Sequence, residues 1–520
     1  MISTIYSGGL YGITAYLVQV EVDISTGLPG FGMVGSLSGE VREAKERVQV
    51  ALRNAGYDLP PMKITVNLAP AHIRKEGTAY DLPIAVGMLA AMGYFSEAAT
   101  EGILFAGELG LDGEIKPVRG ILPIVREAAK SGIRCCVVSG QNAVEGASAS
   151  QIEVRGADHI CQVIRFLQED VQYQDSILPC MTISEESFGV AQEKVPDFGD
   201  VCGQEGAVRA AEIAAAGFHN LLMIGPPGSG KSMIAKRIPG ILPPLSREES
   251  MEVSSIYSVA GLLKESQPIV KVRPFQSPHH TVTKAALTGG SGVPRPGIMS
   301  LAHRGVLFLD ELPEFLRPTL DCMRQPLEEH EVQIARAYGN VTYPADFMLV
   351  CAMNPCICGY YPDQNRCRCS ESSIRKYLGK VSGPVLDRID LCVEIRPVKI
   401  ASLRKKGGES SEEIRRRVME ARKIQEQRYQ GTGLHFNAEI PSADMERYCP
   451  LGVAQQKVME EAYEAMQLSA RGYYRILRVA RTIADLAGEA QIREEHLLEA
   501  ICYRTNDMIY WSNRTDDRNR

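Results

Sequence analysis

The chain has 520 residues, of which 45% are hydrophobic and 23% charged, and its formal net charge is −6 at pH 7. This composition is typical of a globular protein, excludes a disordered or fibrous chain, and at this length predicts about three domains. Because the net charge is negative, any contact with nucleic acid must come from local basic elements.

The N-terminal residues, the longest apolar runs and the cysteines indicate the cellular compartment. The first residues do not resemble a secretory signal, and no apolar run reaches the roughly 18 residues that a membrane helix needs. Several of the 14 cysteines lie in apolar segments, which favours reduced thiols over a disulfide framework. We therefore expect a cytoplasmic protein that contacts no membrane.

Residues 1–168 alternate short apolar runs with helical stretches, which predicts an α/β or α+β domain. Strands are expected at 17–22, 63–67 and 135–138, and helices at 41–54 and 82–95. The polar stretch at 169–197 has poor periodicity and predicts a linker.

Residues 198–398 carry a phosphate-binding pattern, GxxxxGK[ST], between an apolar run at 221–224 and a helical stretch at 233–238. Glycines let backbone amides approach phosphates, the lysine reaches the β- and γ-phosphates, and the last hydroxyl holds Mg²⁺. The sequence therefore predicts an ATP and Mg²⁺ site formed by Gly225, Pro226, Pro227, Gly228, Ser229, Gly230, Lys231 and Ser232.

A second segment predicts hydrolysis. The apolar run at 306–309 is typical of a central parallel strand and is followed by Asp310 and Glu311. Asp310 is expected to bind Mg²⁺ and Glu311 to polarise the attacking water. The alternative is a pair of carboxylates that merely begin a solvated turn.

Three further residues resemble functional positions of AAA+ ATPases. Asn354 follows an apolar strand at 347–353 and resembles sensor 1, Arg388 lies in a segment that resembles an arginine-finger motif, and Arg471 resembles sensor 2. An arginine finger acts on the neighbouring subunit, so Arg388 implies a ring. The alternatives are a local ion pair of Arg388 with Asp387 or Asp390, and, for Arg471, another arginine of the same helix, at 475, 478 or 481.

At full length the chain is similar to the magnesium-chelatase-like AAA+ ATPases of the YifB/ComM type. The similarity rests on the phrases at 200–205, 277–280, 302–315 and 382–390. It implies an α/β multidomain protein with a Lon-protease-like α+β domain at 1–168, an AAA+ P-loop αβα core at 198–398, and a magnesium-chelatase-type helical domain at 413–505. A linker at 399–412 and a polar tail at 506–520 complete the expected organisation.

The resemblance also implies an activity. Characterised members of this type are hexameric DNA helicases that promote branch migration during natural transformation. We therefore expect a homo-hexameric motor that acts on single-stranded or branched DNA, with recombination proteins as possible partners. The alternative is a chelatase-like motor that remodels a protein partner.

Proteolysis is disfavoured. Lon enzymes use a Ser-Lys dyad, and the corresponding positions here are Ala79 and Leu122, which supply neither nucleophile nor base. Thr78 and Lys116 are nearby substitutes with little support.

Two loops complete the candidate sites. Strands at 331–336 and 341–344 predict a hairpin from which Arg336 and Tyr338 contact DNA, although an ordinary surface hairpin fits the sequence equally well. An upstream pair, His279 and His280, lies near a glycine-rich loop and has either a structural or a DNA-related role. The insertion at 356–369 carries paired cysteines that suit a structural Zn²⁺, with unmetallated thiols as the alternative; its ligands would be Cys356, Cys358, Cys367 and Cys369.

Overall fold

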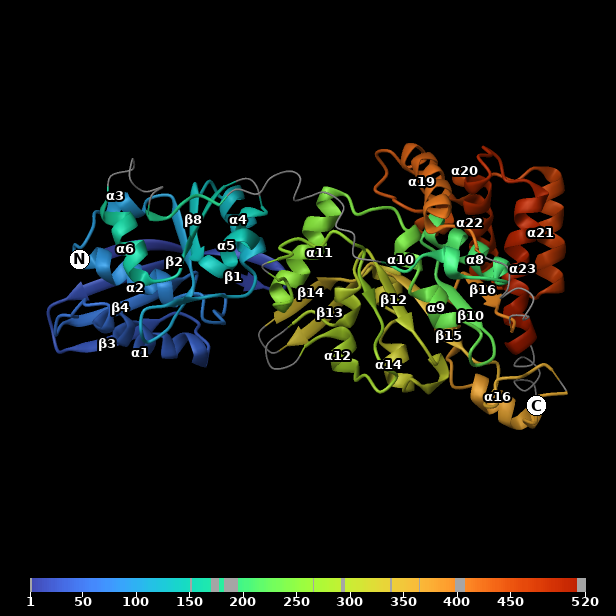
Figure 1. The fold of residues 1–520 in the computed structure, drawn as a ribbon, viewed down its shortest axis with the longest axis horizontal. Coiled ribbons are helices and arrows are strands. Elements are labelled where there is room, and N and C mark those ends of the chain that lie inside the picture. The colour runs from blue at the N-terminus through green and yellow to red at the C-terminus, as the bar shows by residue number, and fades with distance from the viewer. Residues whose placement is uncertain are drawn as a thin grey trace.

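The protein is described by a computed structural model that covers residues 2–149, 152–169, 177–181, 195–264, 266–290, 295–336, 339–363, 365–397 and 407–511. Figure 1 shows three successive parts, with an N-terminal mixed α/β domain in blue, a core in green and yellow, and a helical part in orange and red. The core lies between the other two parts.

The N-terminal domain is built on a seven-stranded mixed sheet of order β3-β4-β2-β1-β5-β8-β9. Strands β1, β2 and β4 are antiparallel neighbours, whereas β1, β5, β8 and β9 run parallel to one another. The strands are β1 (Ile2–Tyr11), β2 (Thr14–Ser25), β3 (Gly30–Val34), β4 (Lys63–Ala69), β5 (Ile103–Ala106), β8 (Cys135–Ser139) and β9 (Glu153–Ala157), with a small pair β6 (Glu108–Leu109) and β7 (Ile115–Lys116).

Helices cover this sheet. They are α1 (Gly39–Asn54), α2 (Asp81–Ala91), α3 (Glu97–Thr100), α4 (Ile121–Lys130), α5 (Gly140–Ala147) and α6 (Ile160–Gln168). Every residue of α2 is buried, including Asp81 at its first position, in keeping with the apolar sequence that follows. The strands and helices expected in this domain are all present, each within a few residues of its expected bounds.

The core contains a five-stranded parallel sheet of order β11-β12-β15-β10-β16. Its strands are β10 (Leu221–Ile224), β11 (Phe275–Gln276), β12 (Val306–Leu309), β15 (Met348–Met353) and β16 (Leu391–Glu394), and β10, β12 and β15 are buried along their whole length. Apolar residues on both faces explain the continuous hydrophobic runs in these segments. The expected hairpin is β13 (Glu331–Arg336) with β14 (Gly339–Pro344).

Short helices surround this sheet. The stretch expected to form one helix at 233–238 instead forms two, α9 (Lys231–Ala235) and α10 (Ile238–Ile241). The other helices are α8 (Glu205–Gly217), α11 (Arg247–Ala260), α12 (Lys284–Thr288), α13 (Ile298–Leu301), α14 (Arg317–Asp321), α15 (Pro326–Glu329), α16 (Glu371–Leu378) and α17 (Gly383–Leu386).

The C-terminal part is helical and packs on α8 of the core, with which it shares one hydrophobic cluster. Its helices are α19 (Ser411–Arg428), α20 (Met445–Tyr448), α21 (Val453–Ala465), α22 (Ala470–Leu486) and α23 (Glu494–Trp511). Helix α23 runs past the boundary expected at 505 and ends at Trp511. Tyr510 is buried and the indole N–H of Trp511 donates to the Leu378 carbonyl.

Parts of three expected segments lie outside the described residues. These are 170–176 and 182–194 of the linker at 169–197, 399–406 of the linker at 399–412, and 512–520 of the polar tail. Among the helices that the structure describes, none is both long enough and apolar enough to cross a bilayer.

The N-terminal domain contacts the core through α4 and through the turn between β1 and β2. Helix α4 packs on α11, where the Gly120 amide donates to the Ser258 carbonyl. At the β1–β2 turn, the Tyr11 hydroxyl donates to the Asn340 carbonyl, with an O···O distance of 2.9 Å. The N-terminal domain therefore touches the hairpin β13–β14.

Candidate nucleotide-binding site

The candidate site is formed where three neighbouring strands of the core end. Strands β12, β15 and β10 are parallel, so their carboxyl ends meet at one edge of the sheet. Asp310 follows β12, Asn354 follows β15, and the loop 225–232 follows β10. The Ser232 hydroxyl donates to Asp310 at 2.6 Å, and the Lys231 ammonium donates to the Asn354 amide oxygen at 3.1 Å.

The glycines of the loop 225–232 have conformational reasons to be glycine. Gly228 and Gly230 have φ values of +75° and +95°, which other residues rarely adopt. A Cβ on Gly225 would lie 2.2 Å from the Ile395 carbonyl oxygen. The loop therefore takes a tight path that exposes backbone amides in the manner of an anion-binding nest.

Lys231 is buried among neutral acceptors. Its ammonium donates to the carbonyls of Gly225 at 2.7 Å and Pro226 at 2.9 Å, as well as to Asn354. Burial lowers the pKa of Lys231 to about 8, against the opposing influence of the negative charges on Asp310 and Glu311. A lysine in this state gains a strong partner when a polyanion enters the loop.

Ser232 and Asp310 provide the oxygen atoms that suit a hard divalent cation. Mg²⁺ takes one or two protein oxygens and completes its shell with water and substrate phosphates. The second carboxylate oxygen of Asp310 accepts a hydrogen bond from the Glu311 amide at 2.9 Å, which fixes the orientation of the carboxylate.

Glu311 has an uncommon backbone conformation. Its φ of +53° and ψ of 45° lie in the left-handed region, which costs a non-glycine residue about 1 kcal/mol or more. Its side chain is 60% exposed, and a carboxylate oxygen lies 3.4 Å from Nδ1 of His280. The sequence offered only two adjacent histidines as a signal and gave no reason to pair one of them with Glu311.

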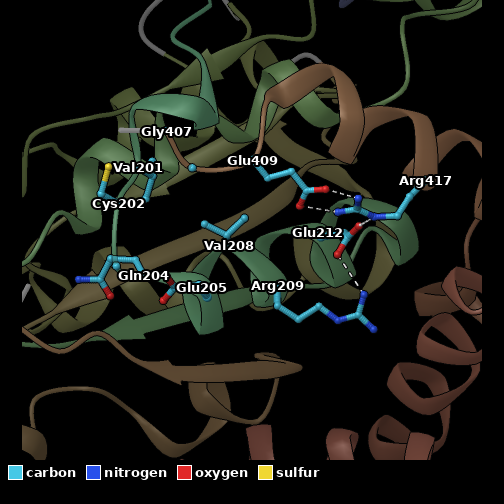
Figure 2. Close-up of a pocket in the computed structure, with 12 residues that line it drawn as sticks. Val201, Cys202, Gln204, Glu205, Val208, Arg209, Glu212, Gly407, Glu409 and Arg417 are labelled. Atoms are coloured by element: carbon cyan, nitrogen blue, oxygen red, sulfur yellow. Dashed lines mark hydrogen bonds and ion pairs between the residues drawn. The ribbon is translucent and has the colours of Figure 1, made fainter. Parts of the chain in front are cut away.

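Figure 2 shows a cavity of the core, with a volume of about 480 Å³, that is connected to the loop 225–232 through Gln204. Gln204 lines the cavity, and its side-chain amide donates to the Ser229 carbonyl of the loop at 3.2 Å. The same amide donates to the Arg396 carbonyl at 2.7 Å. The cavity is lined by Val201, Cys202, Gly203, Gln204, Glu205, Val208, Arg209, Glu212, Gly407, Gly408, Glu409 and Arg417. The sequence analysis had used 200–205 only as a family signature.

A chain of ion pairs closes one end of this cavity. In Figure 2 Arg417 of α19 points toward both Glu409 and Glu212, and Glu212 also pairs with Arg209 at 3.0 Å. Arg209 in turn pairs with Glu499 of α23 at 3.0 Å. The cavity wall is therefore shared by the core helix α8 and the helical C-terminal part.

Arg388 and Arg471 lie at the opposite edge of the sheet. Arg388 precedes β16, and its carbonyl accepts a hydrogen bond from Asn220, which precedes β10. Since β10 spans four residues, this edge is about 13 Å from the start of the loop 225–232. Neither arginine therefore belongs to the group formed by Lys231 and Asp310 of the same chain.

Both arginines converge on Glu328. An Arg388 nitrogen is 2.6 Å from a Glu328 carboxylate oxygen, and an Arg471 nitrogen is 3.6 Å from the same oxygen. Arg471 is 64% exposed at the side chain, whereas Arg388 is 12% exposed and also donates to the carbonyls of Pro384 and Arg324.

Arg388 thus forms an ion pair, but with Glu328, which is remote in sequence, and not with the neighbouring aspartates considered as partners. Asp390, one of the two expected partners, instead lies 3.7 Å from His219 and 3.7 Å from Arg475.

The four cysteines of the insertion come together as expected. Their sulfur atoms all lie within 4.8 Å of one another, and three of the separations are 3.3, 3.6 and 3.8 Å. A tetrahedral Zn²⁺ with Zn–S bonds of about 2.3 Å requires sulfurs about 3.8 Å apart. The donor set and its spacing therefore fit a closed zinc site formed by Cys356, Cys358, Cys367 and Cys369.

The expected DNA contacts fall at the tip of the hairpin β13–β14. Tyr338 and the side chain of Arg336 lie outside the described residues. The backbone of Arg336 pairs with Gly339 at the end of the hairpin. Beside it, Asn340 contacts Tyr11 of the N-terminal domain.

The positions considered for a Ser-Lys dyad carry other residues. Leu122 is fully buried in α4, and the hydroxyl of Thr78 donates to the Glu108 carboxylate. Lys116 lies opposite Glu108 in the β6–β7 pair. The Thr78 hydroxyl is thus engaged by a carboxylate.

Known proteins resemble this chain over all three parts. Family models described as subunit ChlI of Mg-chelatase, magnesium chelatase subunit ChlI, and magnesium chelatase subunit ChlI C-terminal match residues 20–142, 197–403 and 408–504, respectively. The matches follow the N-terminal domain, the core and the helical part.

Individual relatives match nearly the full length. The chain is 42% identical to competence protein ComM of Haemophilus influenzae over 97% of each chain, and 41% identical to the uncharacterized protein YifB of Salmonella typhimurium over 98% of each. A magnesium-chelatase 38 kDa subunit of Rhodobacter capsulatus is 24% identical over 59% of this chain and 86% of its own. The chain therefore belongs to the ComM/YifB family of magnesium-chelatase ChlI-like AAA+ ATPases.

Proposed function

We propose that this protein is an ATP-hydrolysing DNA motor that assembles as a homo-hexamer and moves along single-stranded or branched DNA during recombination or natural transformation. The observation that carries the proposal is the meeting of Lys231, Ser232, Asp310 and Asn354 at one edge of the core sheet. This is the set of groups that phosphoryl transfer from ATP requires.

Each residue of the site has a role in this proposal. The amides of the loop 225–232 and Lys231 hold the β- and γ-phosphates, and Ser232 and Asp310 hold Mg²⁺, which neutralises charge on the phosphates when bound. Glu311 orients and polarises the attacking water, and Asn354 fixes that water beside the γ-phosphate. The base and ribose occupy the cavity of about 480 Å³ next to Gln204.

The hexamer is supported by the placement of Arg388 and Arg471. Both lie at the edge of the sheet opposite the loop 225–232; Arg471 is exposed there, whereas Arg388 would have to leave Glu328 to reach a neighbouring subunit. In a ring they complete the neighbour's site by stabilising the charge that develops on the transferred phosphoryl group. Each subunit then hydrolyses ATP only with help from the next.

The choice of DNA as substrate rests on the relatives and on the hairpin. The Haemophilus relative is named a competence protein, which supports a role in handling DNA. The hairpin β13–β14 is the candidate DNA-contacting element, with Arg336 for phosphates and Tyr338 for base stacking. Its contact with Tyr11 gives the N-terminal domain, which we regard as a Lon-like scaffold without protease activity, a route to influence the hairpin.

A structural Zn²⁺ in the four-cysteine loop is a further part of the proposal. It is supported by the sulfur separations of 3.3 to 3.8 Å. Four protein ligands leave no open position, so this metal takes no part in hydrolysis.

A second candidate is a motor that remodels a protein partner. The match of the core to the magnesium chelatase subunit ChlI favours it. The two candidates differ in what stimulates hydrolysis, because a DNA motor responds to DNA and a remodelling motor to its protein partner.

The test is ATP hydrolysis by the full chain alone, with single-stranded DNA, and with a synthetic four-way junction, at two salt concentrations. The proposal expects stimulation by DNA that weakens as salt rises, since phosphate contacts release counterions. Lys231→Ala serves as the control for contaminating ATPases. Hydrolysis at a competent basal rate that no DNA changes would favour the protein-remodelling motor.

A further inference from the structure

The four-cysteine loop is attached directly to the candidate nucleotide site. Cys356 is buried and follows Asn354 by only two residues, at the end of the central strand β15. The Asn354 side chain in turn accepts a hydrogen bond from Lys231. A change in the position of Cys356 is therefore transmitted to Asn354 through a single intervening residue.

A second contact joins the loop to the phosphate-binding segment. Gly359 lies so close to Pro227 that a Cβ at this position would be 2.4 Å from Cδ of the proline. Gly359 has a φ of +85°, and its amide donates to the Cys356 carbonyl at 3.0 Å. The backbone of the turn at Gly359, directly after Cys358, thus packs against the ring of Pro227 in the loop 225–232.

The other side of the four-cysteine loop packs against the last residues of α23. The ring of Tyr361 lies 6.1 Å from that of Tyr510 in α23, and Trp511 packs on the same cluster as Cys367 and Cys369. The Tyr361 amide also donates to the Cys356 sulfur at 3.4 Å. The loop is held between the helix α23 and the nucleotide site.

We propose that the four-cysteine loop is a zinc-dependent brace of the nucleotide site, which holds Pro227 and Asn354 where ATP and the attacking water need them. Bound Zn²⁺ ties the two cysteine pairs together, so the turn at Gly359 stays pressed against Pro227. Loss of the metal leaves four sulfur atoms without a common partner, and the turn relaxes away from the phosphate-binding loop. This inference rests on the proposed ATPase activity but not on the DNA substrate.

The first measurement is zinc content together with nucleotide affinity. We expect one Zn²⁺ per full-length chain, and a cobalt-substituted protein with the intense sulfur-to-cobalt absorption of a tetrathiolate site. Removal of zinc with a strong chelator should weaken binding of a fluorescent ATP analogue by about tenfold and lower kcat by up to about 100-fold, in line with a displacement of about 1 Å at a reacting group. Added Zn²⁺ should restore both values.

Two kinds of variant distinguish loss of zinc from loss of the contact between the turn at Gly359 and Pro227. Cys369→Ser should lose zinc and reproduce the chelated state, whereas Cys502→Ser, at an exposed thiol of α23, should change neither quantity. Gly359→Ala should keep its zinc and still bind the ATP analogue weakly, because the added methyl group meets Pro227. Gly56→Ala is the matched control, since Gly56 has a φ of +88° but open space around its Cβ position.

The outcomes are distinguishable from those of the proposed motor. A protein that binds no zinc, or a zinc-free protein that binds and hydrolyses ATP as well as the loaded protein, overturns the brace. Zinc-dependent binding of the ATP analogue in a protein that does not respond to DNA supports the brace and contradicts the DNA motor.

Discussion

The strands of the parallel core sheet end at a carboxyl edge, which carries Lys231, and begin at an amino edge, which carries Arg388. The charged groups at these two edges have different kinds of partner. At the carboxyl edge, the Lys231 ammonium donates to neutral oxygens, and burial lowers its pKa to about 8. At the amino edge, Arg388 and Arg471 share the carboxylate of Glu328.

Each edge therefore carries only part of the groups expected at an ATP-hydrolysing site. The carboxyl edge has a cationic group prepared for an anion, but Arg388 and Arg471 lie away from it. The amino edge has arginines but no phosphate-binding loop. In the proposed ring, each interface would join the carboxyl edge of one subunit to the amino edge of the next, and hydrolysis would then depend on assembly.

The largest expected effect comes from the carboxyl edge. Lys231→Ala should reduce ATP hydrolysis to background and weaken ATP binding, because it removes the positive charge from the phosphate-binding loop. The measurement is steady-state phosphate release together with binding of a fluorescent ATP analogue. An unchanged thermal unfolding temperature is the control for folding, and substantial hydrolysis by this variant would disprove the assignment of the loop.

The next effect comes from the amino edge. Arg388→Ala should lower kcat by about 10³-fold, at the low end of the range for arginine fingers, and leave ATP binding largely intact. Mixing this variant with Lys231→Ala subunits should restore activity, since about a quarter of the interfaces in a random ring then pair an intact loop with an intact arginine. The Lys231→Ala/Arg388→Ala double variant, mixed with either single variant, should remain inactive. Failure of the first mixture to recover activity would assign Arg388 a role within its own chain.

A third prediction concerns pH. Burial lowers the pKa of Lys231 to about 8 in the nucleotide-free protein, so the lysine loses its proton as pH rises through 8. Bound phosphates favour the charged form of the lysine. Above pH 8, ATP binding should therefore be accompanied by uptake of a proton, and the affinity for ATP should fall by up to about tenfold per pH unit. Titrations with the ATP analogue between pH 7 and 9.5 test this. Lys231→Arg, whose guanidinium stays charged, should show a flatter profile, and an equally flat profile in the wild type would contradict the prediction.

The smallest expected effect concerns Glu328. Glu328→Gln removes the charge but keeps an oxygen acceptor for Arg388, and the pair is partly exposed, so we expect kcat to fall only about threefold with KM unchanged. Glu329→Gln is the neighbouring control, because Glu329 accepts a hydrogen bond from Gln325 instead. A loss as large as that of Arg388→Ala would mean that Glu328 itself acts on the nucleotide.

The carboxyl edge was predictable from the sequence to a large extent. The runs at 221–224 and 306–309 coincide with β10 and β12, and that at 347–353 differs from β15 by one residue. Continuous apolar runs are the signature of buried parallel strands, and parallel strands deliver the residues that follow them to one edge. The hydrogen bonds of Ser232 with Asp310 and of Lys231 with Asn354 follow from this topology.

The amino edge and the loops were less predictable, because their contacts join residues that no local pattern connects. Glu328 lies 60 residues before Arg388 in the chain, and the sequence favoured nearby aspartates as its partners. The same holds for His280 beside Glu311 and for Tyr11 beside Asn340. The polar sequence after residue 505 concealed the burial of Tyr510 in the continued helix α23.

The most direct test of the central claim is the processing of a labelled four-way DNA junction by the full-length protein with ATP and Mg²⁺. The account predicts ATP-dependent conversion of the junction to branch-migrated products by the wild type and none by Lys231→Ala. Competent ATP hydrolysis in the same reaction, with the junction left unprocessed, would contradict a DNA motor.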